Sequence, residues 1–260
     1  NWTGRLPVTG TPLLMLVLLW MAGRLALLLS VWIGPLAASL VDLAYLAALA
    51  AVIGREIAAG RNWRNLMVLV LVVLLLVANA AFHREAIAEG AAATGYSARL
   101  GLAVTILLIM VIGGRIVPSF THNWLARRGP GRLPIPFNRS DVVVIAASAA
   151  TLAAWVMIAD GSVLSAAFIA AGLLNLWRLS RWAGERTLAE PLVLVLHGAY
   201  LFIPLGFMIG GLIMAVPTLG VPGAAVHAWT AGAIGLMTLA VMTRASLGHM
   251  GQPLRATNGI

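Results

Sequence analysis

The sequence predicts an all-α fold, a polytopic bundle of about eight transmembrane helices, and three observations support that prediction. The chain is 61% hydrophobic and only 10% charged, with a mean hydropathy of +0.98, whereas soluble domains are about one quarter charged. Its apolar residues gather in runs of about 20, the length that a helix needs to span a bilayer. No stretch alternates apolar and polar residues with a period of two, which argues against a β-barrel.

Pro, Gly and Arg residues between the apolar runs set the order of the expected helices. They lie near Pro12–Ile33, Pro35–Ile53, Asn65–Phe82, Ala98–Val117, Asp141–Ala159, Val163–Trp177, Pro191–Ala215 and Ala224–Thr243. The first two are joined by the tight Gly34-Pro35 turn, and the sixth is the shortest. We expect one transmembrane domain over residues 1–260, an internal piece of a longer chain. The segment Pro118–Asn138 is predicted as a loop whose first part lies along the inner headgroups, with Phe120, Trp124 and Leu125 toward the lipid and the arginines toward water.

The arginines predict how the chain is oriented. All 17 basic residues are Arg, and the formal net charge is +9. With a cytoplasmic N-terminus, 14 arginines fall in inner segments and only Arg84 and Arg99 in outer ones, while Arg24 lies within a helix. This asymmetry is typical of membrane proteins whose cytoplasmic loops are positive. The positive charge therefore indicates topology, and we expect no binding to nucleic acid.

The tryptophans lie where aromatic belts at the two membrane interfaces are expected. An inner belt would contain Trp2, Trp63, Trp124, Trp177 and Trp182, and an outer belt Trp32, Trp155 and Trp229. We interpret all of these rings as interfacial anchors.

Two ionisable residues lie within the expected first hairpin. Arg24 precedes the Gly34-Pro35 turn by about ten residues, and Asp42 follows it by about seven. At a rise of about 1.5 Å per residue the two side chains lie within one helical turn of the same depth. Because unpaired charges are costly in the membrane, we predict an Arg24–Asp42 ion pair. Arg24 is also a candidate to hold an anionic group of a cofactor, such as a haem propionate.

Histidine is the best candidate ligand for a cofactor in this chain, because there is no cysteine and imidazole binds both haem iron and copper. Four of the five histidines lie within helices or at their ends, and His122 lies in the predicted loop. Depth divides the four into an outer level, with His83 and His227, and an inner level, with His197 and His249. A height difference on the order of 15–20 Å means that His197 and His227 cannot share one iron. Each histidine alone is more often a packing residue than a ligand.

Five segments carry a family resemblance: VHAWTAGAIGLMTLAVMTRASLGHMGQPL, NWTGR, ANAAFH, IGGRIVPSFTHNWL and LWRLSRWAGERTLAEPLVLVLHGAY. They resemble the NnrS family of bacterial inner-membrane proteins, and the resemblance extends over essentially the whole chain. Members of the family resemble a bundle of about twelve helices, so this chain would lack about two helices at each end.

The resemblance implies a protein that binds haem b and copper in the bacterial inner membrane, linked to nitric oxide and nitrosative stress. The residues that match the family's pattern are His83, His197, His227, His249 and Arg244; with Arg24 they form the predicted cofactor-binding set, and the four histidines are the predicted metal ligands. No catalytic residue is predicted, and nitric oxide and the lipid bilayer are the expected partners. A solute or ion transporter without cofactor, or a structural or maturation subunit of a respiratory complex, remains an alternative.

Overall fold

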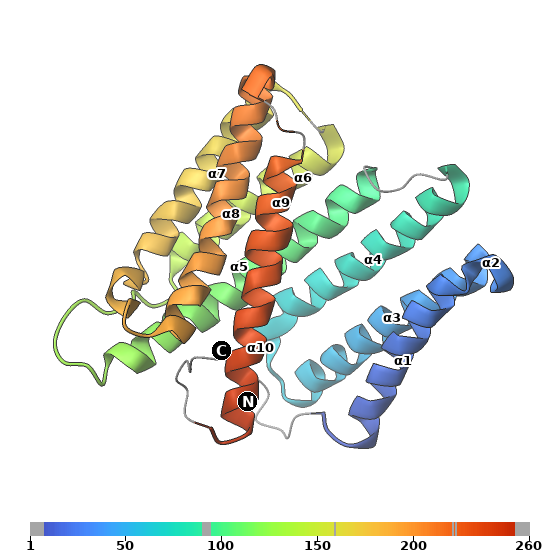
Figure 1. The fold of residues 1–260 in the computed structure, drawn as a ribbon, viewed down its shortest axis with the longest axis horizontal. Helices are drawn as coiled ribbons and strands as arrows, with labels where there is room; N and C mark the ends of the chain where they lie inside the picture. Colours follow the sequence, from blue (N-terminus) through green and yellow to red (C-terminus); the bar gives the residue numbers. More distant parts are fainter. Residues whose placement is uncertain (1–7, 90–94, 159, 220, 222, 253–260) are drawn as a thin grey trace. The chain divides into compact units, whose positions relative to one another are not determined.

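The structure is a computed structural model that describes residues 8–89, 95–158, 160–219, 221 and 223–252. Within that part of the chain, eight helical segments are long and apolar enough to cross a membrane, which confirms the predicted fold class (Figure 1). The helices are α1 (Thr11–Leu28), α2 (Ser30–Ile33), α3 (Pro35–Ala59), α4 (Leu66–Glu89), α5 (Tyr96–Leu125), α6 (Arg139–Ile158), α7 (Ser162–Ser180), α8 (Pro191–Ala215), α9 (Ala224–His227) and α10 (Met237–His249). The short helices η1 (Trp63–Asn65), η2 (Gly184–Thr187) and η3 (Pro217–Leu219) lie between them. A π-helix, η4 (Ala228–Leu236), joins α9 to α10.

Several helices are longer than their apolar runs. Helix α3 continues to Ala59, α4 to Glu89 and α10 to His249, because the polar last turns keep their backbone hydrogen bonds. Hydropathy falls at the first charged residue, whereas the helix ends only where its hydrogen bonding ends.

The prediction that a loop begins at Pro118 is wrong. Helix α5 runs through Pro118 without interruption and ends at Leu125. Proline removes one intrahelical hydrogen bond, and such a residue is tolerated in membrane helices where neighbouring groups compensate. In the turns that follow Pro118 the Thr121 hydroxyl donates a 2.8 Å hydrogen bond to the Val117 carbonyl. Residues 118–125 therefore lie on a helix and not in a loop.

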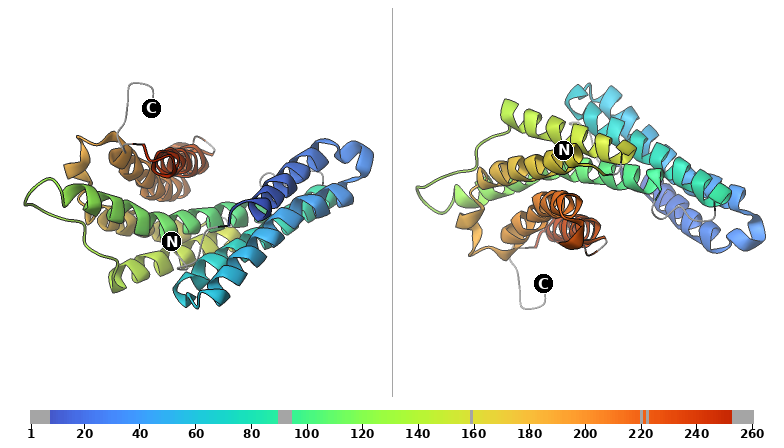
Figure 2. Two further views of the ribbon diagram at one scale, coloured as in Figure 1. Left: turned by 90° about the horizontal axis from the view of Figure 1, so that it is seen from below. Right: turned by 90° about the horizontal axis from the view of Figure 1, so that it is seen from above.

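The chain divides into two compact units, residues 1–104 and residues 105–260. In the first unit α3 packs against α1 and α4, and Figure 2 shows α1 and α3 side by side. Gly23 allows this approach, because a Cβ atom there would lie 3.1 Å from the Asp42 Cα atom. Small residues commonly let membrane helices pack closely in this way.

In the second unit the closest helix pair is α7 and α8. Gly172 faces the backbone of Pro204, and Gly211 faces that of Ser165, so a side chain on either glycine would collide with the partner helix. The Ser165 hydroxyl donates a 2.7 Å hydrogen bond to the Gly211 carbonyl across this interface. The packing of α7 on α8 supplies the rigid frame behind the polar groups described below.

Two of the tryptophans assigned to the belts are buried among helices and so do not face lipid. Trp229 is 0% exposed, and its indole N–H donates a 3.0 Å hydrogen bond to the Ile203 carbonyl. It packs edge-on against Phe207, with ring centroids 5.1 Å apart. Trp182 is 2% exposed and lies against Tyr200. Both rings lie in the interior of the second unit. There the Ile203 carbonyl accepts the Trp229 N–H, and the Tyr200 ring packs against Trp182.

Candidate functional site

Asp42 organises a polar cluster in the first unit, which we name the Asp42 cluster: Arg24, Asp42, Asn79 and His83. The Asp42 carboxylate is 4% exposed, and Arg24 pairs with one of its oxygens, so the predicted ion pair is confirmed. The other oxygen accepts a 2.8 Å hydrogen bond from the Asn79 amide and lies 3.0 Å from His83 Nε2. Two residues of the predicted site, Arg24 and His83, thus meet at one carboxylate.

Replacing Asp42 with alanine is expected to destabilise the protein by about 1–3 kcal/mol, because the partly buried Asn79 amide and His83 ring lose their acceptor. Thermal unfolding of the detergent-solubilised protein measures the change. Asp160→Ala is the control, since Asp160 is an exposed acid outside the cluster. Equal melting temperatures for the two variants would show that the cluster contributes nothing to stability.

A second buried network lies in the second unit around Arg178, which is 0% exposed. Its Nε donates a 2.8 Å hydrogen bond to Asp141, and its Nη1 donates to the Tyr200 hydroxyl at 2.6 Å and to the Met110 carbonyl at 3.1 Å. Asp141 also lies 3.5 Å from the Arg181 guanidinium. The positive charge of Arg178 is therefore matched by a carboxylate and held by two further acceptors, which makes this pair a structural element that joins α5, α6, α7 and α8.

The backbone of α5 makes room for this arginine. A Cβ atom at Gly114 would overlap the Arg178 guanidinium. Gly114 is thus required by the close approach of the Arg178 side chain.

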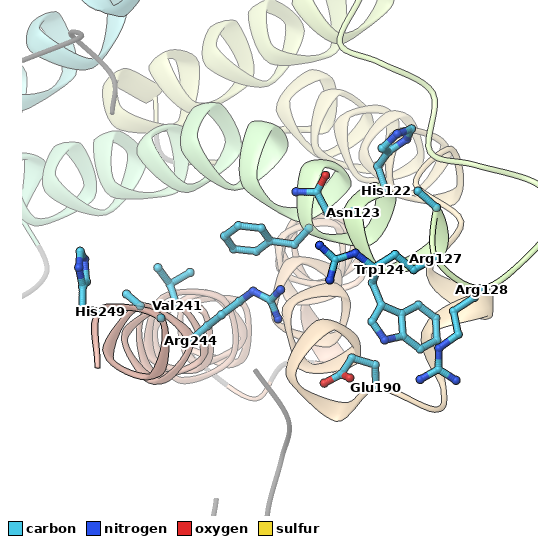
Figure 3. Close-up of a pocket in the computed structure, with 13 residues that line it drawn as sticks. His122, Asn123, Trp124, Arg127, Arg128, Glu190, Val241, Arg244 and His249 are labelled. Atoms are coloured by element: carbon cyan, nitrogen blue, oxygen red, sulfur yellow. The ribbon is translucent and has the colours of Figure 1, made fainter. Parts of the chain in front are cut away.

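A third feature is a cavity of about 1060 Å³ at the ends of α5 and α10 and the start of α8, which we name the arginine cavity. Its polar lining consists of His122, Asn123, Trp124, Arg127, Arg128, Glu190, Arg244 and His249. Figure 3 shows Arg244 reaching from α10 toward the end of α5. The structure thus brings together Arg244 and His249 of the predicted set and adds His122, which the sequence resemblance had left aside.

Cations outnumber anions in the arginine cavity by three to one, with Arg127, Arg128 and Arg244 against Glu190. The Arg244 guanidinium lies 4.4 Å from the centre of the Phe120 ring, and its Nη1 is buried without a hydrogen-bond partner among the described residues. Glu190 is 6% exposed, and its Oε1 likewise has no partner there. Two of the residues that line the cavity therefore contain a buried donor and a buried acceptor without a partner among the described residues.

The two remaining histidines, His197 and His227, belong neither to the Asp42 cluster nor to the lining of the arginine cavity. His197 packs against Trp182, and its Nε2 lies 2.8 Å from the Thr121 hydroxyl, while its Nδ1 has no hydrogen-bond partner among the described residues. His227 is exposed, and its Nδ1 lies 2.9 Å from the Gly223 carbonyl.

The contacts of α8 keep His197 and His227 at different heights. Trp229, two residues after His227, bonds to Ile203, which is six residues beyond His197 on the same helix. Six residues of helix correspond to about 9 Å. This separation supports the prediction that the two imidazoles do not share one iron. Among the residues that the structure describes, no three His, Asp or Glu side chains lie close enough together to hold a metal ion.

The Arg178–Asp141 pair was missed from the sequence, because Arg178 was counted with the inner loops and Asp141 marked only a helix start. The signal was present: the two residues lie at matching distances from the turn between α6 and α7. The depth comparison that identified Arg24 and Asp42 would have found this pair too. Glu190 was missed because nothing in the sequence distinguishes it from a solvated loop carboxylate.

Together the eight spans and their buried polar clusters define a polytopic helical membrane protein. The chain belongs to the NnrS family, because the family model described as NnrS protein matches residues 1–260, the whole chain. This match confirms the family resemblance seen in the sequence. No curated protein and no solved structure matches the chain.

Proposed function

We propose that this protein binds haem b and copper in the bacterial inner membrane and acts in the response to nitric oxide and nitrosative stress. Membership of the NnrS family supports an NnrS-type role, and the eight apolar helices support the membrane location. The proposed cofactor-binding set is His83, His197, His227, His249, Arg24 and Arg244, with the histidines as metal ligands. The arginine-rich loops are proposed to face the cytoplasm.

The observation that carries this proposal is the arrangement of Asp42 and His83. Histidines that bind metals usually donate their other ring N–H to a carboxylate or a backbone carbonyl, which fixes the tautomer and the direction of the ring. His83 Nε2 lies 3.0 Å from the buried Asp42 carboxylate, so Nδ1 is the nitrogen left for a ligand. Arg24 and Asn79 in turn orient the carboxylate.

His227 shows the same arrangement with a carbonyl in place of the carboxylate, since its Nδ1 lies near the Gly223 oxygen and its Nε2 remains for a ligand. His197 presents an unpaired Nδ1 beside Trp182. His249 is the least supported of the four, because no acceptor among the described residues orients its exposed ring. Copper is proposed as a second cofactor, and we do not assign particular histidines to it.

When bound, haem would supply an iron that can take nitric oxide. The chain's own residues would bind and orient the cofactor and exclude water from it. His83 would be held as a neutral ligand by Asp42, and the half-exposed Arg24 would balance negative charge beside it. The apolar faces of α3 and α4 would exclude water from the site. These roles concern binding and orientation, and no catalytic residue is proposed.

Spectra of the purified protein and its histidine variants test this proposal. We expect the wild type to show a Soret band, and His83→Leu to lose most of the haem or metal signal that depends on it. Asp42→Asn is expected to weaken that binding by about 10–100-fold, the usual effect of losing such a partner. His122→Leu, at an exposed histidine outside the proposed set, is the control. Unchanged haem and metal contents in all four variants of the proposed histidines would refute the assignment.

A further inference from the structure

The arginine cavity carries a chemistry that metal-binding histidines do not explain. Arg127, Arg128 and Arg244 line it, and none of them forms an ion pair with a carboxylate among the described residues. Other arginines at the same end of the second unit do have partners: Arg132 pairs with Glu185 at 2.9 Å, and Arg181 contacts Asp141 and Ser140. Three unpaired guanidinium groups around one space create a site for an anion.

The cavity also lies at the ends of membrane-spanning segments, since its lining comes from the last turns of Tyr96–Leu125 and Ala224–His249. Trp124 lines it, with the Arg128 guanidinium 4.6 Å from the ring centre, and tryptophan is enriched where membrane and water meet. On α10, Val241 lies one turn before Arg244 and lines the same cavity, as does Phe120 on α5. These apolar side chains give the cavity an apolar lining next to its cations.

We propose that the arginine cavity binds the headgroup of an anionic phospholipid, with phosphatidylglycerol as the best fit. The phosphate oxygens would accept hydrogen bonds from Arg244, Arg127 and Arg128, and the acyl chains would lie along Val241 and Phe120. Basic pockets between transmembrane helices bind anionic headgroups in this way.

The buried Glu190 narrows the choice of headgroup. Its unpaired Oε1 needs a hydrogen-bond donor, which the phosphodiester of a lipid cannot supply because it carries no proton at neutral pH. A glycerol headgroup carries hydroxyl donors next to the phosphate, so it satisfies Glu190 and Arg244 at once. Phosphatidylcholine has neither a net negative charge nor a hydroxyl donor. This inference does not rest on the proposed function, and a lipid phosphate at Arg244 is the alternative to the cofactor-binding role proposed for that residue above.

Native mass spectrometry of the delipidated protein, with added phosphatidylglycerol or phosphatidylcholine, tests the site. The variant Arg127→Gln/Arg128→Gln/Arg244→Gln is expected to bind phosphatidylglycerol on the order of 100-fold more weakly, a factor of about five for each basic residue. The control Arg61→Gln/Arg64→Gln/Arg139→Gln removes the same charge from exposed positions outside the cavity and is expected to bind as the wild type does. If the triple variant does not fold, Arg127→Gln and Arg128→Gln alone, both at exposed positions, are expected to weaken binding by about five-fold each.

Three outcomes would overturn the proposal. Equal loss of phosphatidylglycerol binding in the two triple variants would show only a general effect of charge. Displacement of the lipid by millimolar inorganic phosphate would show that the site takes a free anion. Loss of haem from the cavity variant with lipid binding intact would show that the carboxylates of the cofactor occupy these arginines. A wild type that binds phosphatidylglycerol but no haem would leave this site standing and refute the proposed function.

Discussion

Asp141→Ala is expected to unfold much of the second unit or to lower the free energy of unfolding by about 3–5 kcal/mol, the usual cost of removing one partner from a buried ion pair. Arg178 is fully buried, and Asp141 is the only carboxylate within ion-pair distance of it among the described residues. The variant would leave a cation in a membrane-embedded interior with only the Tyr200 hydroxyl and the Met110 carbonyl as acceptors. Thermal unfolding followed by size-exclusion chromatography measures the loss.

The double variant Asp141→Leu/Arg178→Met separates the cost of an unpaired charge from the value of the pair. Replacing a buried pair by apolar side chains of similar volume is often close to neutral, so the double variant is expected to recover most of the stability that Asp141→Ala loses. Arg139→Ala, an exposed arginine at the start of the same helix, is the control. An Asp141→Ala protein as stable as this control would contradict the charge-balance argument.

Trp229→Ala is the second change with a large expected effect. The ring fills the space between α8 and η4, and truncating a buried tryptophan in a packed core costs about 3–5 kcal/mol. In a membrane the transfer part of that cost falls away, because lipid is as apolar as the protein interior. What remains is the lost packing against Phe207 and the Ile203 carbonyl left without its donor. We therefore expect about 2–4 kcal/mol.

Two variants check the origin of this effect. Trp32→Ala removes the same ring from a position that is 78% exposed, and we expect little change in the melting temperature. Trp229→Phe keeps an aromatic ring but loses the N–H, so it is expected to recover the part of the loss that comes from packing. If Trp32→Ala destabilised the protein as much as Trp229→Ala, burial of Trp229 would not be the cause.

The sequence alone was sufficient to predict the spans and one of the buried ion pairs. The apolar runs are long, and the Gly34-Pro35 turn fixes the register of the first hairpin, so Arg24 and Asp42 could be set at one depth by counting residues. His83 could not be placed on the same carboxylate, because that contact requires α3 and α4 to pack with a particular rotation. The rotation of a helix about its axis depends on how its side chains pack against neighbouring helices. In helices that are apolar on all sides, the spacing of apolar residues in the sequence does not show which face packs inward.

Some predictions made from residue type alone were wrong. A tryptophan near a helix end is typical of an interfacial anchor, yet Trp229 and Trp182 are buried, with Ile203 and Tyr200 as their partners. Pro118 reads as a helix end, but α5 continues through it. The arginine cavity depends on three segments far apart in the chain, and only the fold brings His122, Arg244 and Glu190 around one space.

The haem and copper content of the intact protein, purified from membranes in mild detergent, tests the central claim most directly. The account predicts a Soret band whose pyridine haemochrome identifies haem b, together with copper detected by elemental analysis, and a change in the spectrum when nitric oxide is added. A colourless protein without iron or copper, prepared from cells supplied with both metals, would contradict it.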